Sequence, residues 1–502
     1  MSKRLNKEAF VQGHSGGSLY EIILIASVPA VLLLIVQLLS YTKNARIIRI
    51  DYFLQFLLLV TPLITQMMGP LSPAAVVGVL VAVALLLVAR NFQLLKRERS
   101  KVPLLAMRQA LSAHRGGVML ITCIAILAVD FHAFPRKFAK VEAFGTGLMD
   151  AGVGSIVIAT GFACGMKEAA AAGTAAAAAV GSSSSIASTN DASSQGGRIR
   201  RDIYRLFALA VLGLSRPLIT SALNYQQHVG EYGVHWNFFL TLAALRGLTL
   251  FVPRAASGSA VTCGLLGTVV LAMHQWLLSN KNMTEYIHSE NFRGSDFISA
   301  NKEGIFSLPG YFALHLLGCA CGAVLEETAG PSRIQLRAGQ RRRVAGIVIG
   351  LWVAFFAVDR LIQPVSRRAC NAAYVLWMLG LNTQSLALLA SATAALPTQP
   401  LPTLLQAVND SMLPTFLIAN VLTGVLNMSI DTMNVGDWGA RIIVLIYMAV
   451  VCLAAVVVQQ LMGRGETSGM INKSGSGGRS LFRPITPYQP ALWRRSLERN
   501  LS

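Results

Sequence analysis

The chain has 502 residues, of which 54% are apolar and only 13% are charged, and its formal net charge is +20. Soluble domains average about 25% charged residues, so this composition excludes an ordinary soluble protein and indicates a membrane protein. A basic balance in a soluble protein would suggest nucleic acid, but in a membrane protein it must first be examined as loop charge.

The seven cysteines are scattered and lack the spacing of a zinc site or a disulfide framework. We therefore expect reduced thiols and no metal.

Thirteen apolar runs follow one another along the chain, each long enough, at about 17 residues or more, for a transmembrane helix. The weakest run is the twelfth, because Asn420 and Asn427 dilute it. The first is too long for a signal peptide, so we expect it to be retained. The sequence predicts an all-α polytopic bundle of about 13 transmembrane helices, over residues 20–40, 52–68, 73–89, 117–134, 144–164, 203–222, 234–253, 258–279, 306–326, 344–363, 369–392, 411–429 and 440–462.

The orientation of the bundle follows from the basic residues, because Lys and Arg are retained on the cytoplasmic side. If the N-terminus lies outside, 28 of the 43 basic residues fall in cytoplasmic segments and 13 on the other side. This ratio predicts an outside N-terminus and a cytosolic C-terminus. The prediction depends on the count of thirteen, since one missed helix would invert everything after it.

Two segments are too polar or too poor in large apolar groups to join the bundle. Residues 167–197 run from alanines into serines, and we expect a flexible cytoplasmic loop whose alanine part can be helical. Residues 466–502 are rich in Gly and Ser and then basic, as expected of a solvated tail near anionic lipids. The remainder, residues 1–465, is predicted to be one transmembrane domain.

The most informative stretch for chemistry is residues 125–155. Asp130 ends an apolar run, Pro135 breaks the chain, and Lys140 precedes the next run, in which Asp150 lies about one and a half turns inside. Consecutive helices joined by a short loop run antiparallel, so Asp130 and Lys140 can meet. Charges near the hydrocarbon usually face a bundle interior or a cavity. Two interpretations stay open at this point: an ion pair that only ties the hairpin, or a functional pair.

Basic residues also occur where the topology predicts few of them. Arg136, Lys137 and Lys140 lie in one such loop, and Arg367 and Arg368 lie in another. Arg and Lys bind phosphate through charge-assisted hydrogen bonds, so these positions indicate a phosphate-bearing ligand, although anionic headgroups would satisfy them equally well.

Further polar residues, His235 and Asn237, stand at the start of an apolar run. The patterns HExxH, GxSxG and the P-loop are absent from the sequence, which excludes several familiar enzyme classes.

Six blocks in order resemble those of the glycosylphosphatidylinositol (GPI) inositol acyltransferase family, called PIG-W in animals. The most distinctive are AILAVDFHAFPRKFAK with FGTGLMDAGVGS, and VSRRACNAAYVLW. The set comprises residues 7–11, 125–155, 225–242, 301–318, 365–377 and 418–433.

The resemblance implies a multi-pass enzyme of the endoplasmic reticulum membrane with a lumenal N-terminus. Relatives transfer a fatty acyl chain, usually palmitoyl, from acyl-CoA as co-substrate to the inositol ring of glucosaminyl-phosphatidylinositol. The partners are then membrane lipids and these two substrates, without nucleic acid and without a permanently bound cofactor.

An Asp and a Lys of the block at residues 125–155 are thought to be catalytic in the family, and they correspond to Asp130 and Lys140. We expect Asp130 to be the base and Lys140 to orient it or to stabilise the oxyanion. His132, where relatives often carry proline, is an alternative base. Substrate-binding candidates are Arg136, Lys137, Asp150, His235, Asn237, Arg367 and Arg368.

Two alternatives from other classes remain. A lipid transporter or scramblase would use buried charges to move protons or headgroups, and it would be expected to show internal repeats, none of which stands out. A scaffold of GPI assembly would use Asp130 and Lys140 only as a structural pair.

Overall fold

The structure is a computed structural model, and it describes residues 10, 13–40, 51–98, 106–181, 200, 202–215, 229–280, 283–328, 338–396 and 400–471. Within these ranges every regular element is a helix. Ten of the helices are long and apolar enough to cross a membrane, which confirms an all-helical polytopic membrane protein. They are α2 (Leu19–Leu39), α5 (Pro73–Arg90), α7 (Ala106–Ala128), α8 (Leu148–Gly181), α12 (Ala260–Asn280), α15 (Lys302–Thr328), α16 (Ala338–Leu361), α17 (Ala372–Ala395), α19 (Met412–Ser429) and α20 (Asp437–Ile471).

The remaining elements are short. The α-helices among them are α3 (Tyr52–Leu59), α4 (Thr61–Met68), α6 (Phe92–Glu98), α10 (Phe238–Leu250), α11 (Arg254–Ser257), α13 (Met283–His288), α14 (Phe297–Ala300) and α18 (Thr403–Asp410). Single 3-10 turns are η1 (Arg136–Phe138), η2 (Val229–Glu231), η3 (Glu290–Phe292) and η4 (Thr432–Asn434).

Two of the thirteen predicted spans differ from a single long helix, and a third is described only in part. The run 52–68 is divided at Val60, because Pro62 opens a new helix and has no N–H to continue the previous one. The run 234–253 contains only the 13 residues of α10. In the run 203–222 the helix is described over 202–215, and its remainder lies outside the described residues. The count of thirteen and the orientation therefore stay predictions.

The two polar segments are described in part. The alanine run continues α8 to Gly181, as the high helix propensity of alanine favours, and residues 182–197 lie outside the described ranges. Helix α20 continues to Ile471, beyond the predicted start of the tail at 466, and residues 472–502 are not described.

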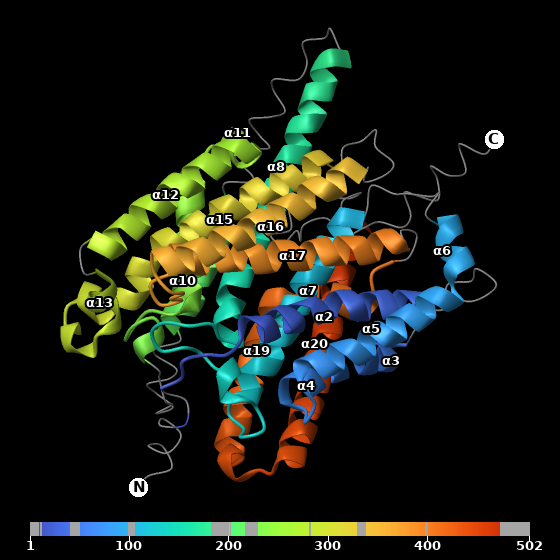
Figure 1. Cartoon of the computed structure of the whole chain (residues 1–502), viewed down its shortest axis with the longest axis horizontal. Helices are drawn as coiled ribbons and strands as arrows, with labels where there is room; N and C mark the ends of the chain where they lie inside the picture. Colours follow the sequence, from blue (N-terminus) through green and yellow to red (C-terminus); the bar gives the residue numbers. More distant parts are fainter. Residues whose placement is uncertain are drawn as a thin grey trace.

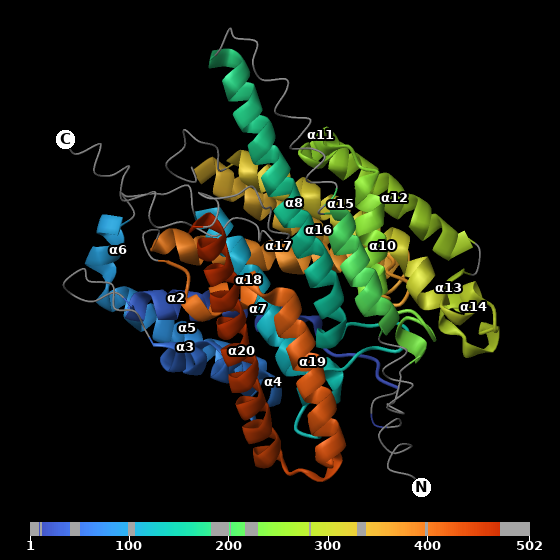
Figure 2. The ribbon, with the colours of Figure 1, turned by 180° about the vertical axis from the view of Figure 1, so that it is seen from behind.

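Helix α17 lies in the middle of the bundle, with α12, α15 and α16 on one side and α2 to α5 on the other (Figure 1). Most of its side chains are buried, Tyr374 and Trp377 completely, and Leu388 is one of the few that are exposed. Helices α5 and α16 instead expose large apolar side chains, such as Leu86 and Ile349, which suits contact with lipid tails. Figure 2 shows the opposite side, where α19 and α20 form a long hairpin.

Candidate functional site

A cavity of about 810 Å³ lies among α2, α7, α8, α17 and α19, and the segment from η2 to α10 also lines it. Helix α7 contributes one continuous face, since His114, Val118, Thr122 and Ile126 all line the cavity at a spacing of four residues, and Asp130 lines it just after the helix ends. At 1.5 Å per residue the cavity follows α7 from His114 to Ile126 for about 18 Å. Its volume is in the range of small-molecule sites, about 300–1,000 Å³. The cavity is therefore long enough for an extended ligand.

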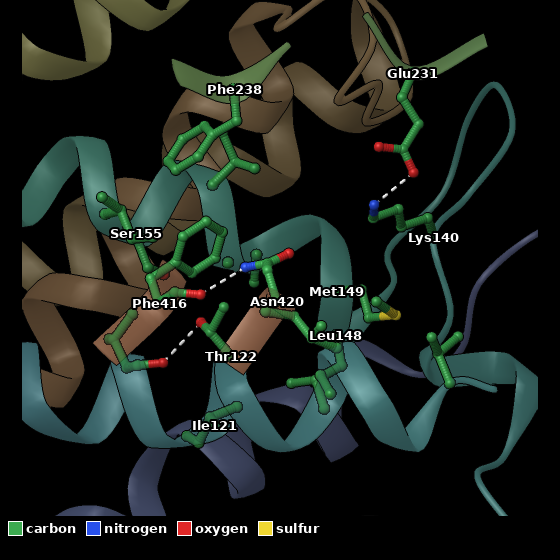
Figure 3. Close-up of a pocket in the computed structure, with 18 of the residues that line it drawn as sticks. Ile121, Thr122, Lys140, Leu148, Met149, Ser155, Glu231, Phe238, Phe416 and Asn420 are labelled. Atoms are coloured by element: carbon green, nitrogen blue, oxygen red, sulfur yellow. Dashed lines mark hydrogen bonds and ion pairs between the residues drawn. The ribbon is translucent and has the colours of Figure 1, made fainter. Parts of the chain in front are cut away.

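The walls of this cavity are mostly apolar, and its charged side chains gather at one end. Asp130, Lys140 and Glu231 line that end, whereas Ser155 and Asn420 are polar residues of the wall. Figure 3 shows Lys140 and Glu231 pointing toward one another beyond Leu148 and Met149. This arrangement suits a ligand with a long apolar part and a polar reacting end.

Lys140 pairs with a residue that the sequence analysis did not identify. Its Nζ donates to Oε1 of Glu231 at 2.5 Å, and the side chains keep 35% and 15% of their surface exposed. Glu231 ends the turn η2, and Gly233 follows with φ +116°, where a Cβ would lie 2.4 Å from the Cα of Asn301. Only glycine fits this close approach, which fixes the Glu231 segment against the start of α15.

Asp130 is positioned by a residue from α19. Its Oδ2 accepts a hydrogen bond from Nδ2 of Asn427 at 2.8 Å. Asn427 belongs to the run that the sequence analysis considered the weakest span. One of the two asparagines that make this run less apolar, Asn427, therefore orients the candidate catalytic carboxylate of Asp130.

Asp150 and Arg367 form a second ion pair, which is sealed from solvent. Arg367 Nε donates to Asp150 Oδ1 at 2.7 Å, and the side chains are only 4% and 1% exposed. Burial acts to lower the pKa of Arg367, but Asp150 holds it well above the ordinary value. Asp150 also accepts from the backbone N–H of Val141 at 3.0 Å, directly after Lys140. This pair therefore supports the loop that carries Lys140.

The other predicted phosphate-binding residues each have protein partners. Arg136 donates to the carbonyls of Phe131 and Phe134, and burial lowers its pKa to about 10. Lys137 pairs with Glu21 at 2.7 Å, and Arg368 pairs with Glu142 at 2.8 Å. None of these three side chains, nor Arg367, lines the cavity. The predicted basic residues are thus distributed around the charged end and do not converge on one point.

The remaining site predictions lie at the edge of the cavity or outside it. Asn237 lines the cavity but caps α10, accepting from two backbone N–H groups and donating to the carbonyl of Gly213 at 2.6 Å. His235 and His132 are exposed and are not lining residues. The ring of His132 packs against Phe10, with centroids 4.4 Å apart.

Comparison with known proteins gives the family. A family model described as GWT1 matches residues 3–458. GPI-anchored wall transfer protein 1 of Yarrowia lipolytica is 35% identical, covering 68% of this chain and 70% of that protein. The protein of the same name from Gibberella zeae is 31% identical over 91% and 97% of the two chains. A phosphatidylinositol-glycan biosynthesis class W protein of Dictyostelium discoideum is 29% identical over 89% and 96%. The chain therefore belongs to the GWT1 family, which confirms the resemblance found in the six sequence blocks.

Proposed function

We propose that this protein acts in GPI-anchor biosynthesis in the endoplasmic reticulum membrane, and that it transfers a fatty acyl group from acyl-CoA to the inositol ring of glucosaminyl-phosphatidylinositol. The names of the relatives from Yarrowia and Dictyostelium support the pathway. The observation that carries the reaction is the cavity, which combines a long apolar interior with one charged end.

The apolar interior suits the acyl chain of the donor. A chain that enters at the charged end and follows α7 toward His114 would be surrounded by apolar faces of α2, α17 and α19. Burial of a long chain contributes about 0.8 kcal/mol for each CH₂ group that leaves water, so the apolar interior favours binding of the chain. The thioester then remains at the charged end, beside Asp130 and Lys140.

The charged end suits acyl transfer to a hydroxyl group. Asp130 takes the proton of the inositol hydroxyl as its oxygen attacks the thioester carbonyl, and general bases of this kind contribute about 10²- to 10⁴-fold. Lys140 stabilises the developing oxyanion, while Glu231 holds the ammonium group in place. The C–S bond then breaks, and coenzyme A leaves as the thiol after its sulfur accepts the proton that Asp130 took from the hydroxyl, which restores the carboxylate.

Reconstitution of the purified full-length protein into liposomes tests this function. The liposomes contain glucosaminyl-phosphatidylinositol, palmitoyl-CoA is added, and mass spectrometry follows the increase in lipid mass by one palmitoyl group. The proposal predicts multiple turnovers without any other protein. A scaffold would give no product, and a scramblase would move the glycolipid between leaflets without changing its mass. Either result would contradict the proposal.

A further inference from the structure

A second group of reactive side chains lies outside the cavity, at the junction of α8, α12 and α15. The ligand atoms of Cys164, His315 and Cys319 lie within 4.8 Å of one another, and among the described residues they form the one such group with metal-binding potential. The buried Cys263 of α12 packs against Cys319, and its thiol donates to the carbonyl of Ala256 at 3.1 Å. Three candidate ligands from α8 and α15 therefore converge, and a further thiol from α12 packs beside them.

Glycine residues bring the helices together at this place. A Cβ on Gly161 would lie 2.5 Å from the carbonyl oxygen of His315, and one on Gly165 would lie 2.0 Å from that of Cys319. The backbone of α8 therefore lies directly against α15, with Cys164 between the two glycines. Close packing explains small residues here, but it does not by itself explain why two thiols lie beside the imidazole of His315.

The hydrogen bonds of His315 fix which of its nitrogens is available. The hydroxyl of Thr160 donates its single hydrogen to the carbonyl of Val157 at 2.6 Å. It must therefore accept from Nδ1 of His315, which lies 3.2 Å away. The proton is then on Nδ1, and the lone pair of Nε2 faces the thiol of Cys319 at 3.6 Å. This tautomer, held by a second residue, is the arrangement found in histidines that bind metals.

We propose that Cys164, His315 and Cys319 bind Zn²⁺, with Cys263 as the fourth ligand. This departs from the expectation of no metal, which rested on sequence spacing alone. Around tetrahedral zinc, sulfur atoms at 2.3 Å from the metal are about 3.8 Å apart. The ligand atoms of Cys164, His315 and Cys319 lie within 4.8 Å of one another, so these three close on the ion with shifts of about 1 Å. With Cys263 as the third thiolate, the site is of the Cys₃His type found in structural zinc sites and carries a net charge of −1.

The site has a structural role. Cys164 lies 14 residues along α8 from Asp150, a rise of about 21 Å, and none of the four ligands lines the cavity. A bound ion would tie three helices together and stabilise the folded protein by mass action. Its loss should lower thermal stability before it affects the chemistry at Asp130.

Metal content of the purified full-length protein tests the proposal. Wild type is compared with Cys164→Ser/Cys319→Ser, and Cys123→Ser/Cys452→Ser is the matched control, since both of its cysteines are buried elsewhere. After exposure to one equivalent of Zn²⁺ and gel filtration, we expect about one zinc per chain in wild type and control, and a loss of at least tenfold in the first double variant. Co²⁺ should give the visible bands of tetrahedral thiolate coordination in the same two proteins.

Single variants cover the case in which the double variant does not fold. Thr160→Val keeps all ligands but removes the partner of Nδ1, and we expect a 10- to 100-fold loss of Co²⁺ affinity. His315→Gln should lose binding entirely, whereas Cys164→His should retain it. Zinc that is absent from loaded wild type, or equally present in all variants, would overturn the proposal.

Discussion

Two ion pairs stand next to one another around the same loop, and they differ in what they can do. Lys140 and Glu231 face the cavity and remain partly exposed, with 35% and 15% of their side-chain surface accessible. Asp150 and Arg367 are almost completely buried. A buried pair must stay paired, because an isolated charge in the interior is strongly destabilising. The partly exposed Lys140–Glu231 pair can exchange partners with a substrate. We therefore assign a role in the chemistry to this pair and a structural role to the buried Asp150–Arg367 pair.

The largest effect is expected at Asp130. Asp130→Asn keeps the contact with Asn427 but removes the base, so the rate of acyl transfer should fall by about 10²- to 10⁴-fold while the thermal midpoint stays near that of wild type. Product formation in microsomes, normalised to folded protein, measures this. His132→Ala is the control and should retain activity, since its ring lies outside the cavity. Retention in Asp130→Asn with loss in His132→Ala would instead assign the base to His132.

Breaking the buried Asp150–Arg367 pair should have the largest effect on stability among these variants. Asp150→Asn leaves Arg367 buried without its counter-charge, and we expect a loss of about 3–5 kcal/mol in the free energy of unfolding. Thermal unfolding in detergent shows this as a lower midpoint and a lower yield. Adding Arg367→Met should recover part of the loss. If the double variant were no more stable than Asp150→Asn, the pair would not be the structural unit described.

Removal of the positive charge of Lys140 should lower the rate of acyl transfer more than it lowers the stability of the protein. Lys140→Met takes away a positive group from the charged end, and loss of an oxyanion-stabilising donor costs about 10²- to 10³-fold. Glu231→Gln should have a smaller effect in the same direction, because Lys140 keeps its charge but loses its anionic partner. Both are measured as kcat in the liposome assay. Full activity of Lys140→Met would remove Lys140 from the mechanism.

The smallest of these effects is expected at Asn427. Asn427→Ala removes one hydrogen bond to Asp130, and such a bond contributes about 1.5–3 kcal/mol when one partner is charged, so activity should fall by roughly 10- to 100-fold. Ser429→Ala is a matched control on the same helix, because its exposed hydroxyl donates to the carbonyl of Val425 and does not line the cavity. Equal losses in both variants would indicate damage to α19 rather than to the position of Asp130.

The sequence was sufficient for the class of fold, because long apolar runs are local features. It also singled out Asp130 and Lys140, which both line the cavity, while their roles stay predictions. Glu231 could not be predicted in the same way, since it lies 91 positions from Lys140 and its turn has no distinctive pattern. The pairing of Asp150 with Arg367 joins residues 217 positions apart. Asn427 lowers the apolarity of its run because its side chain is an amide, and that same amide donates to Asp130.

The location of the acyl chain is the most direct test of the central claim, which is that the cavity along α7 holds the donor. Palmitoyl-CoA with a photoreactive diazirine near the end of its chain is cross-linked to the reconstituted protein, and labelled peptides are identified by mass spectrometry. We predict labels near His114 and Leu389, at the deep end of the cavity, that unlabelled palmitoyl-CoA prevents. Labels confined to the lipid-facing helices α5 and α16, or insensitive to competition, would contradict the account.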